Sequence, residues 1–274
     1  MPYKQVSIIT KRYRDRKPPV GSQINWGHPL ARGLVGCWLM NEGGGNILND
    51  LVGKRVPIGT SIWQPTPKGI GNRGTNSGNT NVSTNNLNFT SGGFTLITFF
   101  YQFAGMGTNN TILFQRQHYT SDADNAGWRI GIRSSGDAFI PNKYFFLNSN
   151  NVSLQNAWIA STTNNGIGFW MVAGVSDGTT IKRIYINGKQ ENTGTTYLNP
   201  LSETSANLVC VGRNSPTIVN IMCLAYNRVL SPSEIRSLYE APYQFIQPIV
   251  RRFYLQTGAV ANKLTRRRVM LSCN

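Results

Sequence analysis

The hydrophobic residues of this chain recur in short runs that are separated by polar turns. Residues 94–103 are apolar on both alternating faces, which is typical of a central strand covered on both sides. Residues 128–133 alternate instead, with Trp128, Ile130 and Ile132 on one face and two arginines on the other, as in a half-exposed strand. Further strand-like runs occur at residues 34–40, 111–117, 144–147, 158–162, 168–175, 207–213 and 218–227. We therefore expect about a dozen antiparallel strands.

Turn signals join these runs. Asn187-Gly188 predicts a two-residue type I′ turn, so residues 180–186 and 189–193 form a hairpin. Gly43-Gly44-Gly45 predicts a tight turn; it is not a phosphate loop, because no lysine follows at that spacing. Residues 53–88 predict short strands between long turns, with a polar surface loop over 72–86.

One short helix is predicted near the C-terminus. Ser231 precedes Glu234 by three positions with Pro232 between them, which is a capping box opening a helix. Ile235 is the first residue of the apolar face of this helix, and Pro242 ends the helix. A strand followed by this helix predicts the closing unit of a β-sandwich.

Composition supports one large β domain. The chain has 274 residues, of which 40% are hydrophobic and 11% aromatic, enough for a sizeable core, and its 28 glycines favour turns over long helices. No segment approaches the ~18 apolar residues that span a membrane. The first residues also lack the apolar run of a secretory signal, so we expect a protein made and kept in the cytosol.

The formal charge of +16 is concentrated at the two ends. Residues 1–17 hold six cations against Asp15, and residues 251–274 hold six cations and no acid. Such segments commonly act as interaction arms, although a solvated tail that binds nothing is the alternative. The predicted partner-binding residues are Lys11, Arg12, Arg14, Arg16, Lys17, Arg251, Arg252, Arg266, Arg267 and Arg268.

Cysteine and metal chemistry are weakly indicated. Cys37, Cys210 and Cys223 lie in apolar runs and predict buried thiols, with a disulfide between Cys210 and Cys223 left open. His28 and His118 are isolated and predict structural roles rather than a zinc site. We expect no cofactor and no metal.

Three phrases resemble laminin-G-like domains of the concanavalin A-like lectin/glucanase superfamily. They are GLVGCWLMNEGGG at 33–45, IYING at 184–188 and RVLSPSEI at 228–235, in the family order. The resemblance implies an all-β, concanavalin A-like jelly-roll sandwich of two antiparallel sheets with one short C-terminal helix. We expect a basic N-terminal arm over 1–23, the sandwich over 24–245 and a basic C-terminal arm over 246–274.

The resemblance also bears on glycoside hydrolysis, calcium binding and sugar binding. Glycoside hydrolases of the superfamily carry an E-x-D-x-x-E phrase, which this chain lacks; Glu191 stands alone, and we expect no enzyme activity. Related domains often bind calcium, for which the Asp122, Asp124 and Asn125 cluster is the best local candidate, although such turns usually serve backbone geometry. Trp63 and Trp170 are candidates either for stacking on sugars or for the core.

Two further phrases, WGHPLARGLVG at 26–36 and SLYEAPYQ at 237–244, are similar to virion components of tailed bacteriophages. This resemblance implies a virion structural protein, located in a virion assembled in the host cytoplasm. The leading hypothesis is a capsid decoration or cement protein whose arms bind the major capsid protein or other virion subunits, as a homo-oligomer in the assembly. The alternative is a glycan-binding lectin module of a tail or fibre. Nucleic-acid binding by the arms is a third hypothesis, and no membrane partner is expected.

Overall fold

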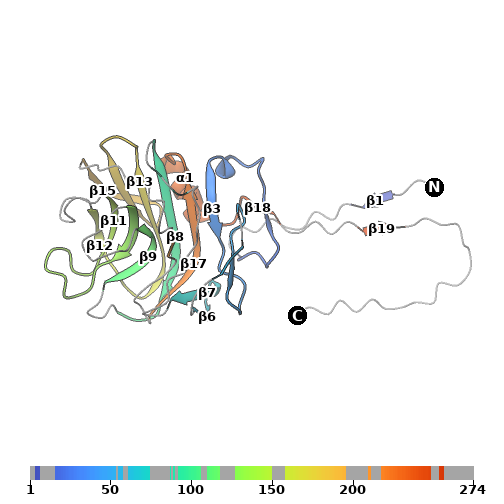
Figure 1. The fold of residues 1–274 in the computed structure, drawn as a ribbon, viewed down its shortest axis with the longest axis horizontal. Coiled ribbons are helices and arrows are strands. Elements are labelled where there is room, and N and C mark those ends of the chain that lie inside the picture. The colour runs from blue at the N-terminus through green and yellow to red at the C-terminus, as the bar shows by residue number, and fades with distance from the viewer. Residues whose placement is uncertain are drawn as a thin grey trace, which may run out of the picture. The chain divides into compact units, whose positions relative to one another are not determined.

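A computed structural model shows two compact units, one formed by residues Met1–Lys11 and Ile249–Asn274 and the other by Arg12–Pro248. The structure describes residues 4–6, 16–53, 55–57, 61–74, 87, 89, 92–105, 110–117, 127–149, 158–195, 209–210, 217–247 and 253–255. The larger unit is a sandwich of two antiparallel sheets, which confirms the predicted fold class (Figure 1).

The smaller sheet of the sandwich has five strands in the order β12-β11-β10-β9-β16. Their bounds are β9 Thr111–Gln117, β10 Gly127–Ile132, β11 Lys143–Ser149, β12 Trp158–Asn164 and β16 Val209–Cys210. The alternation along β10 sends Trp128, Ile130 and Ile132 into the core, as predicted.

The larger sheet runs β15-β14-β13-β8-β17-β7-β6, with β3 also paired to β17. The bounds are β3 Leu34–Trp38, β6 Ser61–Thr66, β7 Gly69–Gly74, β8 Phe94–Gln102, β13 Gly168–Ser176, β14 Lys182–Ile186, β15 Lys189–Gly194 and β17 Ile218–Tyr226. Every residue of β17 is buried, because β17 lies in the middle of the sheet with a packed layer on each face.

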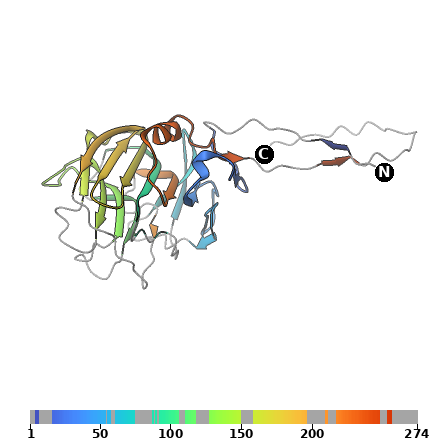
Figure 2. The same ribbon diagram turned by 90° about the horizontal axis from the view of Figure 1, so that it is seen from above.

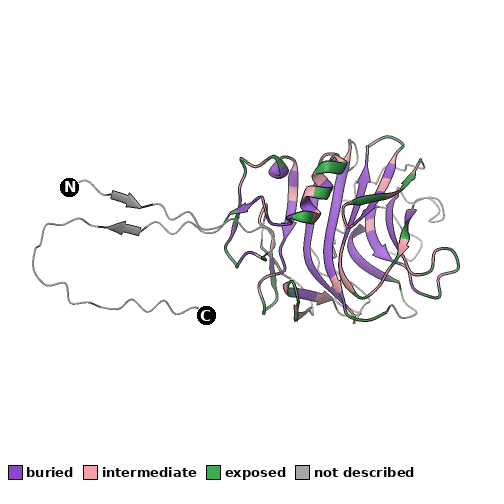
Figure 3. Cartoon of the chain, turned by 180° about the vertical axis from the view of Figure 1, so that it is seen from behind, coloured by how far each residue is buried: buried purple, intermediate pink, exposed green. Residues whose placement is uncertain are grey.

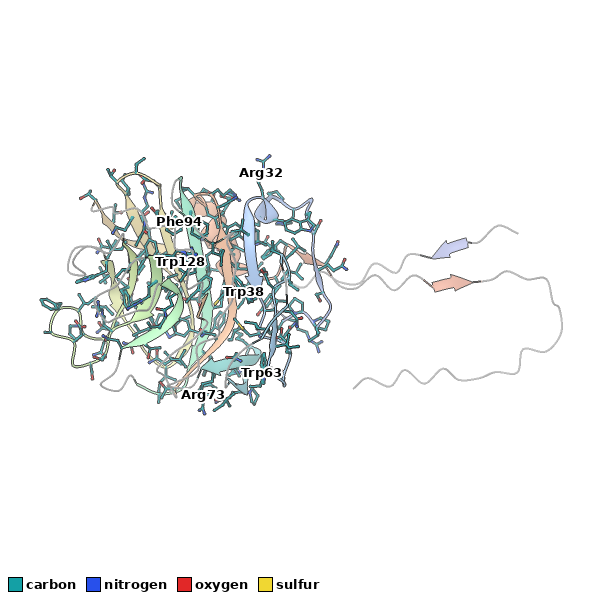
Figure 4. All side chains as sticks on the ribbon, viewed as in Figure 1. Arg32, Trp38, Trp63, Arg73, Phe94 and Trp128 are labelled. Carbon is teal, nitrogen blue, oxygen red and sulfur yellow. The ribbon has the colours of Figure 1, made fainter. Side chains whose placement is uncertain are left out.

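The main core lies between the two sheets and is rich in aromatic rings. Phe114 stands edge-on to both Trp38 and Trp128, at 5.8 and 4.8 Å between ring centroids. Phe89 stacks on Phe94 at 4.6 Å. Figure 4 labels Trp38, Phe94 and Trp128 among the side chains of this layer.

A third layer covers the outer face of the larger sheet. It contains helix α1 (Pro232–Glu240), the 3-10 helix η1 (Pro29–Ala31) and the segment after α1. Ile235 and Leu238 of α1, Leu30 of η1 and Phe245 pack there against strand residues such as Phe99. Figure 2 shows α1 above the strands, and Figure 3 shows it in front of the buried strands of this sheet.

The local predictions for the helix and the hairpin are confirmed. The Ser231 hydroxyl accepts from the Glu234 N–H, and the Glu234 carboxylate accepts from the Ser231 N–H, completing the capping box. Asn187 and Gly188 both have positive φ, at 49° and 81°, as a type I′ turn requires. Gly43 and Gly45 have positive φ as well, which agrees with the predicted tight turn.

Buried thiols and a structural histidine are also found. Cys37 and Cys223 are buried, as predicted. The side chain of Cys210 lies outside the described residues, so the alternative of a disulfide between Cys210 and Cys223 stays a prediction. Cys210 lies in β16 and Cys223 in β17, and these strands belong to different sheets. His28 caps η1, because its Nδ1 accepts from the Leu30 N–H at 3.2 Å. His118, Asp122, Asp124 and Asn125 lie outside the described residues.

Short strands occur near both ends of the chain. In the larger unit, β2 (Gln23–Ile24) pairs with β18 (Ile246–Gln247), and β4 (Ile47–Asn49) pairs with β5 (Arg55–Pro57). The larger unit therefore includes residues that the sequence analysis assigned to the arms. In the smaller unit, β1 (Lys4–Val6) pairs with β19 (Phe253–Leu255), so the two ends of the chain form a two-stranded antiparallel ribbon.

Candidate ligand-binding surface

An aromatic surface lies on the outer face of the larger sheet, where strands β8 and β13 run side by side. Tyr101 of β8 pairs directly with Phe169 of β13, so their side chains share one face. Phe103, two residues beyond Tyr101, stands 4.7 Å from the Tyr101 ring and is 38% exposed. Phe99, which is buried beneath, stacks on Phe169 at 6.0 Å. Tyr101 and Phe169 are half-buried, so the rings are anchored from below and accessible from above.

A lysine from a distant hairpin adds a cation to this surface. Lys68 lies in the turn between β6 and β7, and its Nζ is 5.3 Å from the centroid of the Phe169 ring. That distance is within the range of a cation–π contact. The turn is fixed locally, because the Thr66 hydroxyl donates to the Gly69 carbonyl and accepts from the Lys68 N–H. We call Tyr101, Phe103, Phe169 and Lys68 the aromatic–cation surface.

A cleft of about 470 Å³ lies beside Lys68 and is lined by Arg16, Lys17, Pro67, Lys68 and Gly69. Three of its five lining residues are cationic and none is acidic. Arg16 and Lys68 are exposed. The cleft thus extends the aromatic–cation surface with positive charge.

Lys17 contributes to this cleft in an unexpected way. Its ammonium donates to the Met40 carbonyl at 2.9 Å and to the Ile70 carbonyl, so the charged group points toward the sandwich and not toward solvent. Burial lowers the pKa of Lys17 to about 7, against the opposing influence of Glu42 and Cys223. The next residue, Pro18, accepts from the Asn41 amide at 2.8 Å. Lys17 therefore fastens the start of the chain to the sandwich, whereas the sequence analysis expected it to bind a partner.

The other predicted partner-binding residues fall into two groups. Arg16 is described, and it lines the cleft as an exposed cation. The remaining eight, Lys11, Arg12, Arg14, Arg251, Arg252, Arg266, Arg267 and Arg268, lie outside the described residues.

The tryptophans singled out from the sequence belong to the margin of the core. The Trp63 indole N–H donates to the Gly45 carbonyl at 3.0 Å, and that of Trp170 donates to the Gly166 carbonyl at 2.7 Å. Both rings pack against the core between the sheets. Sequence reasoning missed the aromatic–cation surface instead. Its only sequence signal is the placement of aromatic residues at Phe99, Tyr101 and Phe103, every second position of one strand.

Two other surfaces are less suited to a ligand. On the outer face of the smaller sheet, Arg133 lies 4.8 Å from the Phe145 ring centroid, but Phe145 is only 2% exposed and Asp137 pairs with the guanidinium at 3.3 Å. A cleft of about 500 Å³ between α1 and the β14–β15 turn contains Arg236 and Glu240, which pair with each other at 2.9 Å. In both places the arginine is thus already paired with a carboxylate, and in the second Lys189 is a further lining residue.

The carboxylates of the described residues serve the fold. Glu42 accepts from the Asn49 N–H and amide, Asp50 from the Cys37 and Val52 N–H groups, and Asp177 from three N–H groups of its own turn. Glu191, which stood alone in the sequence, accepts from the N–H groups of Thr162 and Thr163 at 2.9 Å. Asp137, Glu234 and Glu240 are paired with arginines.

The described residues contain no group of three His, Cys, Asp or Glu side chains placed to hold a metal ion. In the same part of the chain, no helix has the length and apolarity needed to cross a lipid bilayer.

Comparison with known proteins identifies one matching sequence family and several solved structures with a similar fold. The sequence model of the family described as "Concanavalin A-like lectin/glucanases superfamily" matches residues 76–236. No curated protein sequence matches the chain. Among solved structures, the binding domain of Paraclostridial Mosquitocidal Protein 1 is similar with a TM-score of 0.57 at 12% identity, over 77% of this chain and 52% of that one.

Two further solved structures have the same fold. Trypanosoma rangeli sialidase, in complex with a difluoro-KDN compound, gives a TM-score of 0.51 at 16% identity, over 76% of this chain and 32% of that one. Botulinum neurotoxin type C, whose cell entry depends on interaction with two ganglioside molecules, gives a TM-score of 0.51 at 13% identity, over 76% of this chain and 51% of that one. The chain thus spans about half of the two toxin structures and about a third of the sialidase. At these identities the likeness concerns the fold.

Proposed function

The chain belongs to the concanavalin A-like lectin/glucanases superfamily, and from that premise we propose that it is a carbohydrate-binding module without catalytic activity. The observation that carries the proposal is the aromatic–cation surface, where accessible rings are fixed on a rigid sheet. The ganglioside dependence of botulinum neurotoxin type C, a protein with a similar fold, supports the same class of ligand.

The chemistry of the surface suits a sugar. The less polar face of a pyranose presents C–H groups, and these pack on the negative face of an aromatic ring. Tyr101 and Phe169 occupy neighbouring strands, so a ligand meets two rings side by side without ordering a loop. Sites built on strands hold their geometry well, which lowers the entropic cost of binding.

The absence of catalysis is part of the proposal. Glycoside hydrolysis uses two carboxyl groups that flank the scissile bond. The seven described carboxylates hold backbone N–H groups or arginines, and none lines the aromatic–cation surface or its cleft. A carboxylate committed in this way is not available as an acid or a nucleophile.

A pair of substitutions tests the proposal. Tyr101→Leu keeps apolar volume but removes one ring face, and we expect the Kd for oligosaccharides that bind the wild type on a glycan array to rise about tenfold, as the loss of roughly 1.4 kcal/mol implies. Phe139→Leu is the matched control, because Phe139 is 70% exposed in the loop after β10. Saturable binding measured by calorimetry that is insensitive to Tyr101→Leu, or no binding across the array, would contradict the proposal.

A second candidate function is a structural role in a virion, which the basic ends of the chain favour. The pairing of β1 with β19 brings the two ends of the chain into one unit, which holds Lys4, Lys11 and the six cations of residues 251–274. The other four N-terminal cations belong to the larger unit. We propose for this candidate a capsid decoration or cement protein that binds acidic sites on the capsid as a homo-oligomer. A sugar-binding module in a virion tail or fibre would combine the two candidate functions, carbohydrate binding by the sandwich and attachment to the virion by the basic ends.

A further inference from the structure

We infer that the carbohydrate ligand is acidic, and that the cleft lined by Arg16 and Lys68 binds its carboxylate or sulfate group while the neighbouring Tyr101 and Phe103 rings carry the sugar ring. This inference rests on the proposed function and names the ligand class of the same surface. Four observations support it, and each concerns a different property of the cleft.

The first observation is the charge of the lining. Arg16 and Lys68 are both exposed, and no acid among the described residues lines the cleft. An exposed arginine offers a planar fork of donors that fits a carboxylate or a sulfate, and a lysine adds a point charge. Neither of these two cations has an ion pair among the described residues, since the described carboxylates are engaged elsewhere. An anion entering the cleft therefore displaces none of the described carboxylates.

The second observation is the role of Lys17. Because its amine donates to the Met40 and Ile70 carbonyls, the side chain forms a wall of the cleft and not a ligand. Its Cδ would lie 3.2 Å from a Cβ added at Gly69, whose φ of 104° also disfavours any side chain. The glycine thus keeps the floor of the cleft open, and Lys17 holds the adjacent Arg16 against the sandwich.

The third observation is the spacing of charge and ring. The Lys68 ammonium lies over the Phe169 ring, 5.3 Å from its centroid, so the cation covers this part of the aromatic–cation surface. A sugar ring that packs on the neighbouring Tyr101 and Phe103 rings therefore places a substituent beside Lys68. A neutral hydroxyl gains one ordinary hydrogen bond there, whereas an oxyanion gains a charge-assisted one.

The fourth observation is the origin of the residues. All five lining residues of the cleft lie before residue 76, where the match to the family begins, whereas Tyr101, Phe103 and Phe169 lie within it. The three rings thus lie in the part of the chain that the family model matches, and the cleft residues lie before it. The cleft joins the β6–β7 hairpin of the larger sheet to Arg16 and Lys17.

The test compares acidic oligosaccharides with their neutral counterparts. The probes are an oligogalacturonate and its carboxyl-reduced form, and a sulfated galactan oligosaccharide and its desulfated form. We expect the wild type to bind at least one acidic probe about tenfold more tightly than its neutral form, a difference equal to one charge-assisted hydrogen bond. Carboxylate and sulfate are distinguished by which pair shows the preference.

Three substitutions assign the preference to the cleft. Arg16→Gln is expected to lower the acidic-to-neutral affinity ratio to about threefold or less while neutral binding is retained, and Lys68→Gln is expected to lower the same ratio by a similar factor. Lys189→Gln removes an exposed lysine from the β14–β15 turn and controls for net charge, so the ratio should not change. Unchanged urea midpoints show that the variants are folded.

The outcomes separate the inference from the proposed function. Equal binding of acidic and neutral probes, with sensitivity to Tyr101→Leu, overturns the acidic ligand and leaves the carbohydrate-binding module standing. A loss of preference in Lys189→Gln as large as in Lys68→Gln also overturns the cleft, because the effect is then one of overall charge. No binding of any probe, together with silence on the glycan array, contradicts both.

Discussion

Lys17 is a buried amine whose protonation opposes folding at neutral pH. Burial lowers its pKa in the folded protein to about 7, whereas a lysine in the unfolded chain keeps its ordinary pKa of 10.5. Between these two pH values the folded chain has released the proton and the unfolded chain still holds it, so the free energy of unfolding increases as pH rises. The neutral amine keeps two N–H groups, which is enough for both the Met40 and Ile70 carbonyls.

We therefore expect the urea midpoint to increase between pH 7 and pH 9.5, with one such group adding up to about 1.4 kcal/mol per pH unit. Lys17→Met should reduce the slope. Lys182, whose pKa burial lowers to about 8, contributes a residual slope of the same sign. Exposed Lys189→Met is the control and should follow the wild type. Burial also raises the pKa of the Cys37 thiol, so above about pH 8.5 the unfolded chain releases this proton first and the slope becomes smaller. The range ends below pH 10 because burial raises the pKa of Tyr243 and Tyr226, which reverses the slope. A flat profile for the wild type would refute this account.

For single residues, the sequence predicted the roles that depend on neighbours along the chain. The structural role of His28 follows from its place before Pro29, and the buried thiol of Cys37 follows from its apolar run. The partners of Lys17 and Glu191 could not be predicted, because Ile70 and Thr162 are far away along the chain and reach them only through the fold. The cationic cleft could not be predicted for the same reason, because Arg16 and Lys68 are far apart along the chain.

Helix α1 depends on its capping box, and this element allows a direct stability prediction. Ser231→Ala removes the acceptor for the Glu234 N–H, and we expect a loss of about 1 kcal/mol in the free energy of unfolding. Ser135→Ala, at an exposed position of the loop after β10, is the control. Measurement by urea denaturation is suitable because the helix packs on the buried face of the larger sheet.

Glu234 is expected to matter more than Ser231. Its carboxylate also pairs with Arg228 at 2.7 Å, and the Arg228 Nε donates to the Arg32 carbonyl at 2.7 Å. Glu234→Ala thus loosens the cap and the contact between α1 and the segment before β3, so its destabilisation should exceed that of Ser231→Ala. Equal effects of the two substitutions would show that the ion pair contributes nothing measurable to the free energy of unfolding, which is common for exposed ion pairs.

Elements with a strong local pattern were predicted closely. Strands β8, β9 and β13, the β14–β15 turn and α1 fall within a residue or two of their predicted bounds, since alternation and turn residues define them. Strand β16 is Val209–Cys210, and the rest of the predicted run 207–213 lies outside the described residues. Strands β5, β6 and β7 were foreseen only as short strands between turns, because Gly, Asn, Thr, Ser and Pro dominate residues 53–88.

The arrangement of the whole molecule was beyond a local reading. That the sequence implies two sheets follows from the family resemblance, but the order β13-β8-β17 joins segments from distant parts of the chain. The third layer was missed for a similar reason. Residues 24–34 and 241–246 have no regular pattern, yet they cover the outer face of the larger sheet together with α1. Non-local packing of this kind leaves no periodic signal in the sequence.

The virion hypothesis makes its prediction at this scale. Removal of residues 1–15 and 249–274 deletes the smaller unit while retaining Lys17, Pro18 and the β2–β18 pair, which hold the start and end of the sandwich. If the basic ends bind an acidic capsid lattice, co-sedimentation with capsids should be lost, while the urea midpoint and oligosaccharide affinity of the truncated chain stay near the wild type.

A charge-preserving variant then identifies the kind of contact. Replacement of Arg12, Arg14, Arg251, Arg252 and Arg266–Arg268 by lysine keeps the net charge of +16 but removes the planar fork that binds carboxylates in pairs. A weakened association would indicate bidentate pairing with carboxylates, whereas an unchanged one would indicate attraction by charge alone. Binding of nucleic acid instead predicts a log affinity that falls linearly with log salt for DNA of any sequence. Undiminished co-sedimentation after truncation would remove the arms from the mechanism and leave the sandwich, with its aromatic–cation surface, as the part that binds.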